Sequence, residues 1–462
     1  RTIAVVGASN KPNNWATYGF LQPLLDFGFS GEVYPVNLSA ASVLGLEAYS
    51  RVSDIPGPVD YVILSVPIEQ VLACIKDCAA KGVKSVCIYT AGFSEGGQAQ
   101  GKKQEVLFLE IARRNGMRLI GPNCIGIYYP VGHLTFSAIA PMKPGNVAYI
   151  SQSGRFCNDF LAYGEQRGIA FSKAVSFGNA LDINETDLLE YMGQDSETKI
   201  VTAYLEGIRG GARFARVLRE VSEVKPVIII KGGFTQEGRR AVMSHTASLS
   251  GREEVWKGLM KQAGAISAGS MEEMSDLAMT FSLMSKPKGL KVAVIGAGGG
   301  ANVLGSDALS KAGFKIPAFS KEVQEKLRKF IPISGTWVNN PVDFSPSTAG
   351  DPELTSKSIE IAGSIEEIDL VIVHYMMGKW AAAAEERTRN FGKRVGEAGK
   401  KIKKPVAIVL ETHGYPEIMK IAYEMKQDWL NAGLCVYPDM SRAATCLGKL
   451  AMYWAVGFRD RA

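Results

Sequence analysis

One of the four histidines of the 462-residue chain stands in a long segment of small residues. His245 lies within Ser244–Gly251, and this segment comes after the apolar run Val227–Ile230. Loops at the carboxyl ends of parallel strands usually carry chemistry. Imidazole attacks phosphorus at neutral pH when a carboxylate fixes its tautomer, and Glu206, after the run Ile200–Leu205, is the candidate for that carboxylate. The sequence therefore predicts a nucleophilic histidine; a surface histidine without a catalytic role is the alternative.

Three glycine-containing turns connect an apolar run to a helical sequence, at residues 7–12, 151–154 and 296–301. Free N–H groups and the helix dipole at a helix N-terminus favour anions, so each turn is a candidate phosphate site. In the second turn Ser153 is a suitable N-cap residue, and its hydroxyl and backbone N–H also suit an oxyanion. Ordinary capping without a ligand is the alternative for this turn.

Neither the first nor the third turn is a complete dinucleotide fingerprint. In the first, Ser9 and Pro12 replace two of the three glycines, and the second strand ends at Val36–Asn37, where an acid would hold a ribose. Lys11 is available for the phosphate of another nucleotide-bearing ligand; a plain strand–helix turn is the alternative. The third turn matches GxGxxA, which keeps a nicotinamide cofactor under consideration, although the first acid after the next extended segment is Glu322 in a new helix. A run this rich in glycine also lets the backbone approach a bare phosphate closely.

The other histidines and the seven cysteines do not predict a metal site. His374 has the surroundings of a buried core histidine, and the sequence identifies no acid–base partner for His133 or His413. The cysteines form neither a disulfide framework nor a CxxC pair, and core packing explains Cys74 and Cys78, which share one helical face. Free thiols indicate a reducing compartment, the cytoplasm.

Composition excludes several other classes of protein. Hydrophobic residues make up 46% and charged residues 21%, as in ordinary globular domains. The 52 basic and 46 acidic residues leave a net charge of +6, too little for nucleic acid but suited to anionic small molecules. No apolar run approaches the roughly 18 residues of a membrane span. The first residues, Arg1–Val6, read as a strand and not as a signal peptide, and we expect the chain to begin a little upstream.

Short apolar runs alternate with helical stretches along the whole chain, which predicts an α/β fold of parallel sheets covered by helices. Two segments interrupt the alternation: Pro130–Gly145 has no clear helix, and Ser285–Gly289 is short, polar and rich in breakers. We therefore predict three Rossmann- or flavodoxin-like domains, at residues 1–130, 145–285 and 290–462.

The order of these motifs resembles that of the NDP-forming acyl-CoA synthetases, the superfamily that includes succinyl-CoA ligase. The similarity is greatest to the α subunit of the ADP-forming acetyl-CoA synthetase type and extends over essentially the whole chain. The motifs that carry it are Val5–Ser9, Gly121–Gly126, Ser151–Gly154, Ser176–Asn179, Glu206–Gly207, Ser244–Thr246 and Asn340–Asp343. The resemblance implies a CoA-binding domain, a ligase domain with the active histidine, and a ligase-CoA domain.

The resemblance also implies a mechanism and its residues. Acyl-CoA and phosphate give an acyl phosphate, and the phosphoryl group passes to His245, held by Glu206, and then to ADP. The implied phosphate ligands are Ser153, Gly154, Gly299 and Gly300. The implied CoA contacts are Gly7, Ala8, Ser9, Lys11, Val36, Asn37, Ser65, Pro67, Gly92, Phe93 and, near the thiol, Asn123. Gly178, Asn179 and Asp343 are implied to face the acyl or phosphate site.

A third α/β domain stands where the resemblance would otherwise place an ATP-grasp domain. The resemblance therefore implies that ATP or ADP and Mg²⁺ bind to an ATP-grasp β subunit on a separate chain, in an α2β2 assembly. The bulky segment Arg155–Asn158 favours an acid larger than acetate. A nicotinamide-dependent oxidoreductase and a non-catalytic CoA-binding regulator are the two alternative functions.

Overall fold

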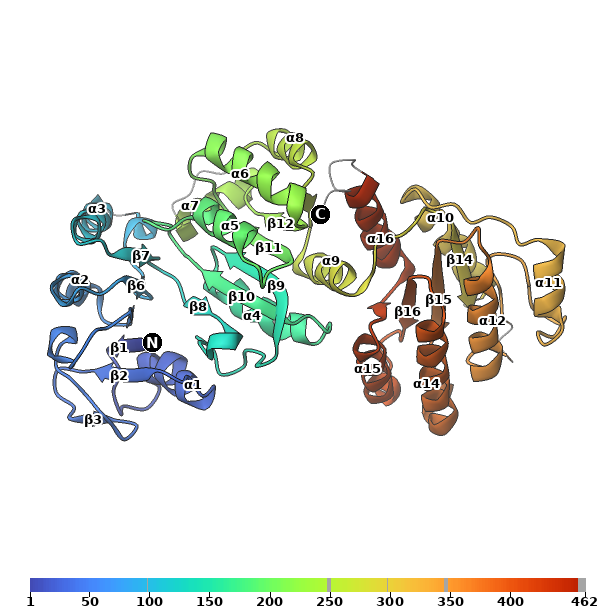
Figure 1. Cartoon of the computed structure of the whole chain (residues 1–462), viewed down its shortest axis with the longest axis horizontal. Coiled ribbons are helices and arrows are strands. Elements are labelled where there is room, and N and C mark those ends of the chain that lie inside the picture. Colours follow the sequence, from blue (N-terminus) through green and yellow to red (C-terminus); the bar gives the residue numbers. More distant parts are fainter. Residues whose placement is uncertain (98, 247–250, 297, 345–347, 456–462) are drawn as a thin grey trace. The chain divides into compact units, whose positions relative to one another are not determined.

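The computed structural model describes residues 1–97, 99–246, 251–296, 298–344 and 348–455 (Figure 1). For residues 243–246 the description is limited to the helix to which they belong. The chain forms two compact units. The first contains residues 1–165 and 169–274, and the second contains residues 166–168 together with the chain from residue 275.

The first unit begins with a five-stranded parallel sheet in the order β2-β1-β5-β6-β7. Its strands are β1 (Thr2–Val6), β2 (Glu32–Val36), β5 (Tyr61–Leu64), β6 (Ser85–Ile88) and β7 (Arg118–Ile120). A small hairpin, β3 (Ser42–Val43) and β4 (Leu46–Glu47), forms a separate two-stranded sheet that contacts β2. The helical segments are η1 (Ala16–Leu21), α1 (Gln22–Asp26), η2 (Val52–Asp54), α2 (Ile68–Lys81), η3 (Ser94–Gly96) and α3 (Ala99–Arg114).

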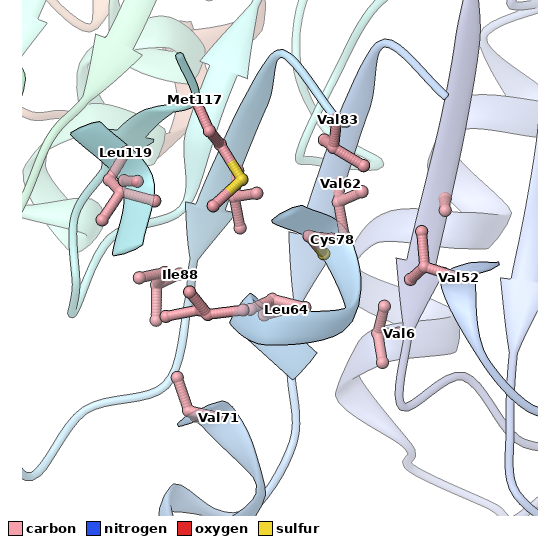
Figure 2. Packing of buried hydrophobic residues seen from close by; sticks show 14 of the residues in the cluster. Val6, Val52, Val62, Leu64, Val71, Cys78, Val83, Ile88, Met117 and Leu119 are labelled. Atoms are coloured by element: carbon pink, nitrogen blue, oxygen red, sulfur yellow. The ribbon is translucent and has the colours of Figure 1, made fainter. Parts of the chain in front are cut away.

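The core of this sheet consists of aliphatic strand residues packed against α2 and α3. Figure 2 shows Val62, Leu64 and Ile88 from the strands close to Val71 and Cys78 from α2. Cys78 is fully buried in this core and Cys74 packs against it, which confirms the core-packing interpretation of the two cysteines.

The second sheet of the first unit has the order β13-β12-β11-β9-β10-β8. All neighbours are parallel except β8, which pairs antiparallel with β10. The strands are β8 (Gly126–Tyr128), β9 (Pro144–Ser151), β10 (Phe171–Ser176), β11 (Ile200–Leu205), β12 (Val227–Lys231) and β13 (Ile266–Ser267). The helical segments are η4 (Pro130–Gly132), α4 (Gly154–Glu165), α5 (Glu185–Gln194), α6 (Gly211–Val224), α7 (Gln236–Thr246) and α8 (Glu253–Ala263). The next helix, α9 (Met271–Leu283), begins in the first unit, but most of its residues belong to the second. β8 thus precedes residue 130 in the chain but is a strand of the second sheet.

The second unit has a four-stranded parallel sheet in the order β14-β15-β16-β17. Its strands are β14 (Val292–Gly296), β15 (Leu370–Met376), β16 (Val406–Glu411) and β17 (Cys435–Tyr437). α10 (Gly299–Lys311) packs with α16 (Met440–Ala455), while α12 (Pro352–Ser364), α14 (Glu385–Lys401) and α15 (Pro416–Asn431) form another packed row (Figure 1). Two shorter helices are α11 (Lys321–Arg328) and α13 (Trp380–Ala383).

A buried ion cluster lies in the second unit. Asp276 of α9 is fully buried and forms ion pairs with Arg167 and with Arg442 of α16. The Arg442 Nε donates to Asp276 Oδ2 at 2.6 Å. Burial raises the pKa of the Asp276 carboxyl, while the two guanidinium groups oppose this shift.

The three sheets confirm the predicted α/β class. The strands β1, β5 and β12 are buried along their whole length, as expected for parallel strands with helices on both faces. Among the described residues, no helix combines the length and the apolar character that crossing a bilayer requires.

Candidate active site

Three strand ends converge at the first glycine turn. Gly7 follows β1 with φ +99° and donates its N–H to the carbonyl of Val36 at 2.9 Å. A Cβ atom at Gly7 would stand 2.1 Å from the carbonyl oxygen of Ser65. Only glycine fits this position, because both the backbone conformation and the close approach exclude a side chain. The turn brings together three of the predicted CoA contacts at the carboxyl edge of the first sheet.

Asn37 and Asn14 hold the shape of this turn. The Asn37 Nδ2 donates to the carbonyl of Ala8 at 2.8 Å, and its Oδ1 accepts the N–H of Ser39 at 2.9 Å. The Asn14 Nδ2 donates to the carbonyl of Gly7 at 3.2 Å. The Lys11 side chain is exposed beside the turn, as a phosphate ligand requires.

Ser9 and Pro67, two more of the predicted CoA contacts, lie at the same edge of the sheet. The side chain of a third, Phe93, does not face this edge. The Ser9 hydroxyl accepts the N–H of Lys11 at 3.4 Å, and Pro67 is the N-cap residue of α2. Gly92 has φ +102° and donates its N–H to Glu95 at 2.6 Å. The Phe93 side chain is fully buried against Phe108, with the ring centroids 5.4 Å apart. The Phe93 ring therefore belongs to the core, and the predicted contact of this loop with CoA stays a prediction that its backbone would have to fulfil.

The first and second sheets of the first unit meet where Asn123 and Asn179 lie side by side. The Asn123 Nδ2 donates to the Asn179 Oδ1 at 3.5 Å. The Asn179 Nδ2 donates to Glu95 at 2.6 Å and to Glu105 at 3.1 Å. A Cβ atom at Gly178, which has φ +54°, would lie 2.2 Å from the carbonyl oxygen of Pro122. The structure therefore brings together Asn123, Gly178 and Asn179, and most of the amide of Asn179 is used in holding the two sheets together.

The second predicted phosphate cradle is the N-terminus of α4. The Ser153 hydroxyl accepts the N–H of Phe156 at 3.3 Å, as predicted for an N-cap residue. The Ser151 hydroxyl in turn donates to the carbonyl of Ser153 at 2.7 Å and accepts its N–H at 3.2 Å. Gly154 starts the helix, where a Cβ atom would press on Ile125 at 3.1 Å. This turn is rigid, because its hydroxyls and backbone bond to one another.

Glu206 is fixed beside that cradle by contacts to the turn after β9, to the end of β12 and to its own strand, β11. Gln152, which directly precedes Ser153, accepts the N–H groups of Glu206 and Gly207 on its Oε1, the latter at 3.0 Å. The Lys231 Nζ at the end of β12 donates to the carbonyl of Glu206 at 2.7 Å. The Tyr204 hydroxyl donates to the Glu206 Oε1 at 3.0 Å. The side chain of Glu206 is only 3% exposed, so its position is set by these groups and not by solvent.

The Lys231 side chain is an unusual buried cation. It also donates to the carbonyl of Gly232 at 2.5 Å and lies over the Phe234 ring. Burial lowers the pKa of Lys231 to about 8, and the charge of Glu206 opposes that shift. A buried cationic side chain therefore lies at the start of the segment that leads to His245.

His245 belongs to the last turn of α7, and its side chain lies outside the described residues. The helix α7 packs against η3, the turn that carries Ser94 and Glu95. The predicted pairing between His245 and Glu206 therefore stays a prediction.

The third cradle lies in the second unit. α10 starts at Gly299 after the N-cap residue Gly298, and a Cβ atom at Gly299 would lie 3.5 Å from Asp343 Oδ2. Gly299, Gly300 and Asp343 are therefore neighbours within this unit. Burial raises the pKa of the Asp343 carboxyl. Whether this helix N-terminus binds the same phosphate as Ser153 stays a prediction.

The remaining histidines take other roles. His374 is 3% exposed on β15, and its Nε2 hydrogen bonds to Glu411 at 2.9 Å, which lowers the pKa of that carboxyl. The expectation of a buried core histidine is confirmed, and the Nδ1 of this ring has no hydrogen-bond partner among the described residues. The His133 Nδ1 lies 2.8 Å from the carbonyl of Phe27. Within the described residues, no group of three or more side chains is arranged to hold a metal ion.

Sequence reasoning missed Gln152, Tyr204 and Lys231. Gln152 and Tyr204 each lie within two residues of a predicted site residue, which is the only local signal that they carry. Their contacts to Glu206 join β9, β11 and β12. These strands are far apart in the sequence, so the contacts follow only from the order of the strands in the sheet.

Three family models match successive segments of the chain. They are a CoA binding domain at residues 1–130, a succinyl-CoA ligase like flavodoxin domain at 144–281 and a ligase-CoA domain at 292–437. The chain is 41% identical over 351 residues to the acetate–CoA ligase [ADP-forming] II subunit alpha of Pyrococcus furiosus, which is 76% of either protein. It is 34% identical over 464 residues to the acetate–CoA ligase [ADP-forming] II of Archaeoglobus fulgidus, of whose length it spans 66%.

A solved structure is also similar over nearly the whole chain. It is the dinucleotide forming acetyl-coenzyme A synthetase 1 of Ca. Korarchaeum cryptofilum in complex with phosphate and ADP. The TM-score is 0.84 at 32% sequence identity, over 98% of this chain and 95% of the solved one.

Proposed function

The chain belongs to the family of ADP-forming acyl-CoA synthetases, acid–thiol ligases, as an α-subunit type, and we propose that its first unit performs the phosphohistidine step of their reaction. The family resemblance drawn from the sequence is confirmed. These relationships do not favour a nicotinamide-dependent oxidoreductase. In the overall reaction a carboxylic acid, CoA and ATP give acyl-CoA, ADP and phosphate.

The observation that carries the proposal is the position of Glu206 beside the N-terminus of α4. Gln152 accepts two N–H groups at Glu206 and directly precedes Ser153 in the chain. The backbone at Glu206 and the candidate phosphate cradle are therefore held together by the side chain of Gln152. A carboxylate that fixes an imidazole, next to N–H groups that stabilise equatorial phosphoryl oxygens, is the arrangement that phosphoryl transfer to histidine requires.

The proposed steps run in the direction that forms ATP, the reverse of the overall reaction above. A phosphate oxygen attacks the thioester carbonyl of acyl-CoA, and the carbon–sulfur bond breaks to release CoA and form acyl phosphate. A nitrogen of His245 then attacks phosphorus, the phosphorus–oxygen bond breaks, and the carboxylate leaves. The phosphoryl group finally passes from the imidazole to ADP. Ser153 and Gly154 bind the transferred group, and Gly299 and Gly300 are the further predicted ligands.

We assign CoA to the carboxyl edge of the first sheet. The turn at Gly7 to Lys11 faces the diphosphate, and Asn37 supports the turn by its hydrogen bond to Ala8. Asn123 stands near the thiol end because it adjoins both Thr90 at the end of β6 and Asn179 of the second sheet. This order places the thioester next to the junction at which Gly178 and Asn179 lie.

The nucleotide is proposed to bind elsewhere. We infer an ATP-grasp β subunit on a separate chain, which supplies the ADP site and Mg²⁺, in a cytoplasmic α2β2 complex. The metal with the nucleotide would supply charge neutralisation for the second phosphoryl transfer. The residues of this chain would deliver the phosphoryl group on His245.

Labelling of the complex with [γ-³²P]ATP and Mg²⁺ tests the proposal. We expect a label on the α chain that is stable to base and labile to acid, and that is absent from a His245→Ala variant. His374→Ala is the matched control, because that histidine is buried and bonded to Glu411. A label that persists in His245→Ala, or that disappears in His374→Ala alone, would contradict the assignment.

A further inference from the structure

A cavity of about 630 Å³ lies in the first unit between α6 and α8, at the end of β12. The two helices pack against each other, and Figure 1 shows them side by side. The volume is within the range of small-molecule sites, about 300–1,000 Å³. Ser153, Gly154 and Glu206 do not line this cavity, so it is distinct from the candidate phosphate cradle.

The walls of the cavity are mainly apolar. Phe214 of α6 and Trp256 of α8 line it, and both side chains are buried. Their rings stack at an interplanar angle of 24°, with the centroids 6.2 Å apart. Leu259 lines the same wall, and Val255, which is 59% exposed, lies where the cavity opens to solvent. A flat apolar group can therefore enter and be covered by aromatic side chains.

A buried cation also lines the cavity. Lys231 is only 9% exposed, and its Nζ donates to the carbonyls of Glu206 at 2.7 Å and of Gly232 at 2.5 Å. An ammonium has three donors, and among the described residues the third has no acceptor and no carboxylate pairs with the charge. With a pKa of about 8, the group stays protonated at neutral pH. A buried charge without a counterion is costly, so this position favours an anionic ligand.

The charge of the lining has one sign. Arg252, the N-cap residue of α8, is the second cation of the cavity, and none of the described lining residues is acidic. The Lys231 ammonium lies over the ring of Phe234, another lining residue, 5.3 Å from its centroid. Cationic and aromatic groups thus lie side by side in one cavity, which is complementary to an anion with an apolar body.

We propose that this cavity binds an aromatic monocarboxylate, with its carboxylate on the ammonium of Lys231 and its ring against Phe214 and Trp256. The carboxylate supplies the third acceptor in a charge-assisted hydrogen bond. The inference goes beyond the phosphohistidine step, because neither His245 nor the phosphate cradle takes part. The same chemistry suits a substrate acid and a regulatory acid, and kinetics separate the two.

Binding of phenylacetate to the full chain, measured by isothermal titration calorimetry, tests the proposal. Gly258 lines the cavity on α8, and a Cβ atom there would have no neighbour within 4 Å. A leucine at this position therefore occupies the cavity without a clash, and we expect Gly258→Leu to abolish binding. Lys261→Leu is the matched control, because it adds the same side chain at an exposed position of α8 that does not line the cavity.

A second pair of measurements tests the cation. Lys231→Met should weaken phenylacetate binding by about 10- to 100-fold, as expected for a hydrogen bond between charged groups. The neutral analogue phenylacetamide should bind the wild type and Lys231→Met equally. Three results would overturn the proposal: no binding of phenylacetate to the wild type, equal affinity in Gly258→Leu, or the same loss in Lys261→Leu. These titrations need neither ATP nor His245, so they are independent of the labelling that tests the proposed function.

The reconstituted complex shows which role the acid has. If phenylacetate is a substrate, Gly258→Leu should lower its kcat/KM and leave that of acetate unchanged. If it is a regulator, the wild type should change its rate of acetate turnover when phenylacetate is added, and Gly258→Leu should not. Either result supports the site.

Discussion

Replacing Gly178 by alanine should disrupt the junction between the two sheets of the first unit. The new Cβ atom would lie 2.2 Å from the carbonyl oxygen of Pro122 and 2.4 Å from that of Asn123. Ordinary carbon–oxygen contacts begin at about 3.3 Å, so these carbonyls must move by about 1 Å. The carbonyl of Pro122 also accepts the N–H of Asn179 at 3.0 Å, and this hydrogen bond would be lost or bent.

Gly210 offers a control with a similar backbone conformation and open space. Its φ is +66°, against +54° at Gly178, and a Cβ atom there would have no neighbour within 4 Å. The left-handed conformation alone destabilises an alanine by about 1–2 kcal/mol. Gly178→Ala adds overpacking, and we expect a total loss of about 2–5 kcal/mol. The difference between the two variants isolates the steric contribution.

Hydrogen exchange at increasing urea concentrations measures this difference for peptides of the first unit alone. The unfolding midpoint of peptides covering residues 119–129 and 171–183 should fall much further in Gly178→Ala than in Gly210→Ala. The KM for acyl-CoA should rise only in Gly178→Ala, because Asn123 is displaced. Equal losses in the two variants would refute the argument from close approach.

Two other predictions concern buried charges. Because burial lowers the pKa of Lys231 to about 8 from 10.5, the unfolded chain binds more protons between these pH values, and the unfolding free energy of the wild type should rise with pH across this window. Relative to Lys231→Met, the rise should be on the order of 3 kcal/mol in urea titrations, and a constant difference would contradict it. In the second unit, Asp276→Ala leaves Arg167 and Arg442 without their shared carboxylate and should lower stability by about 3–5 kcal/mol. An exposed carboxylate with one helical ion-pair partner, Glu220, should lose less than 1 kcal/mol on the same change; similar losses would show that the Asp276 cluster contributes no more than a surface pair.

The strands were predictable because helices bury both of their faces. The apolar run at Ile200–Leu205 is β11 with the same bounds, and Val227–Ile230 is β12 without its last residue. By contrast, β8 has only three residues and is antiparallel, so its sequence carries too little periodicity to reveal it. Its existence depends on β10, which lies almost fifty residues further along the chain.

The local structure of the candidate site was predictable where it depends on a residue's own backbone conformation or on its nearest neighbours in the sequence. Gly7 and Gly178 need positive φ and close approach, and Ser153 caps the helix that it precedes. The burial of the Phe93 ring was not predictable, because the sequence does not tell which side of a loop faces the core. The supports of Glu206 come from neighbouring strands, so they require the order of the sheet.

The hydrogen bonds of Asn179 have a consequence for motion within the first unit. Its amide joins two carboxylates of the first sheet's helical layer, and the backbone of residues 179–183 pairs with residues 119–122. Sliding one sheet past the other would leave several of these buried groups unsatisfied at once. A hinge between the two sheets is therefore disfavoured. A ligand that spans them meets a preorganised frame, so little reorganisation energy opposes its binding.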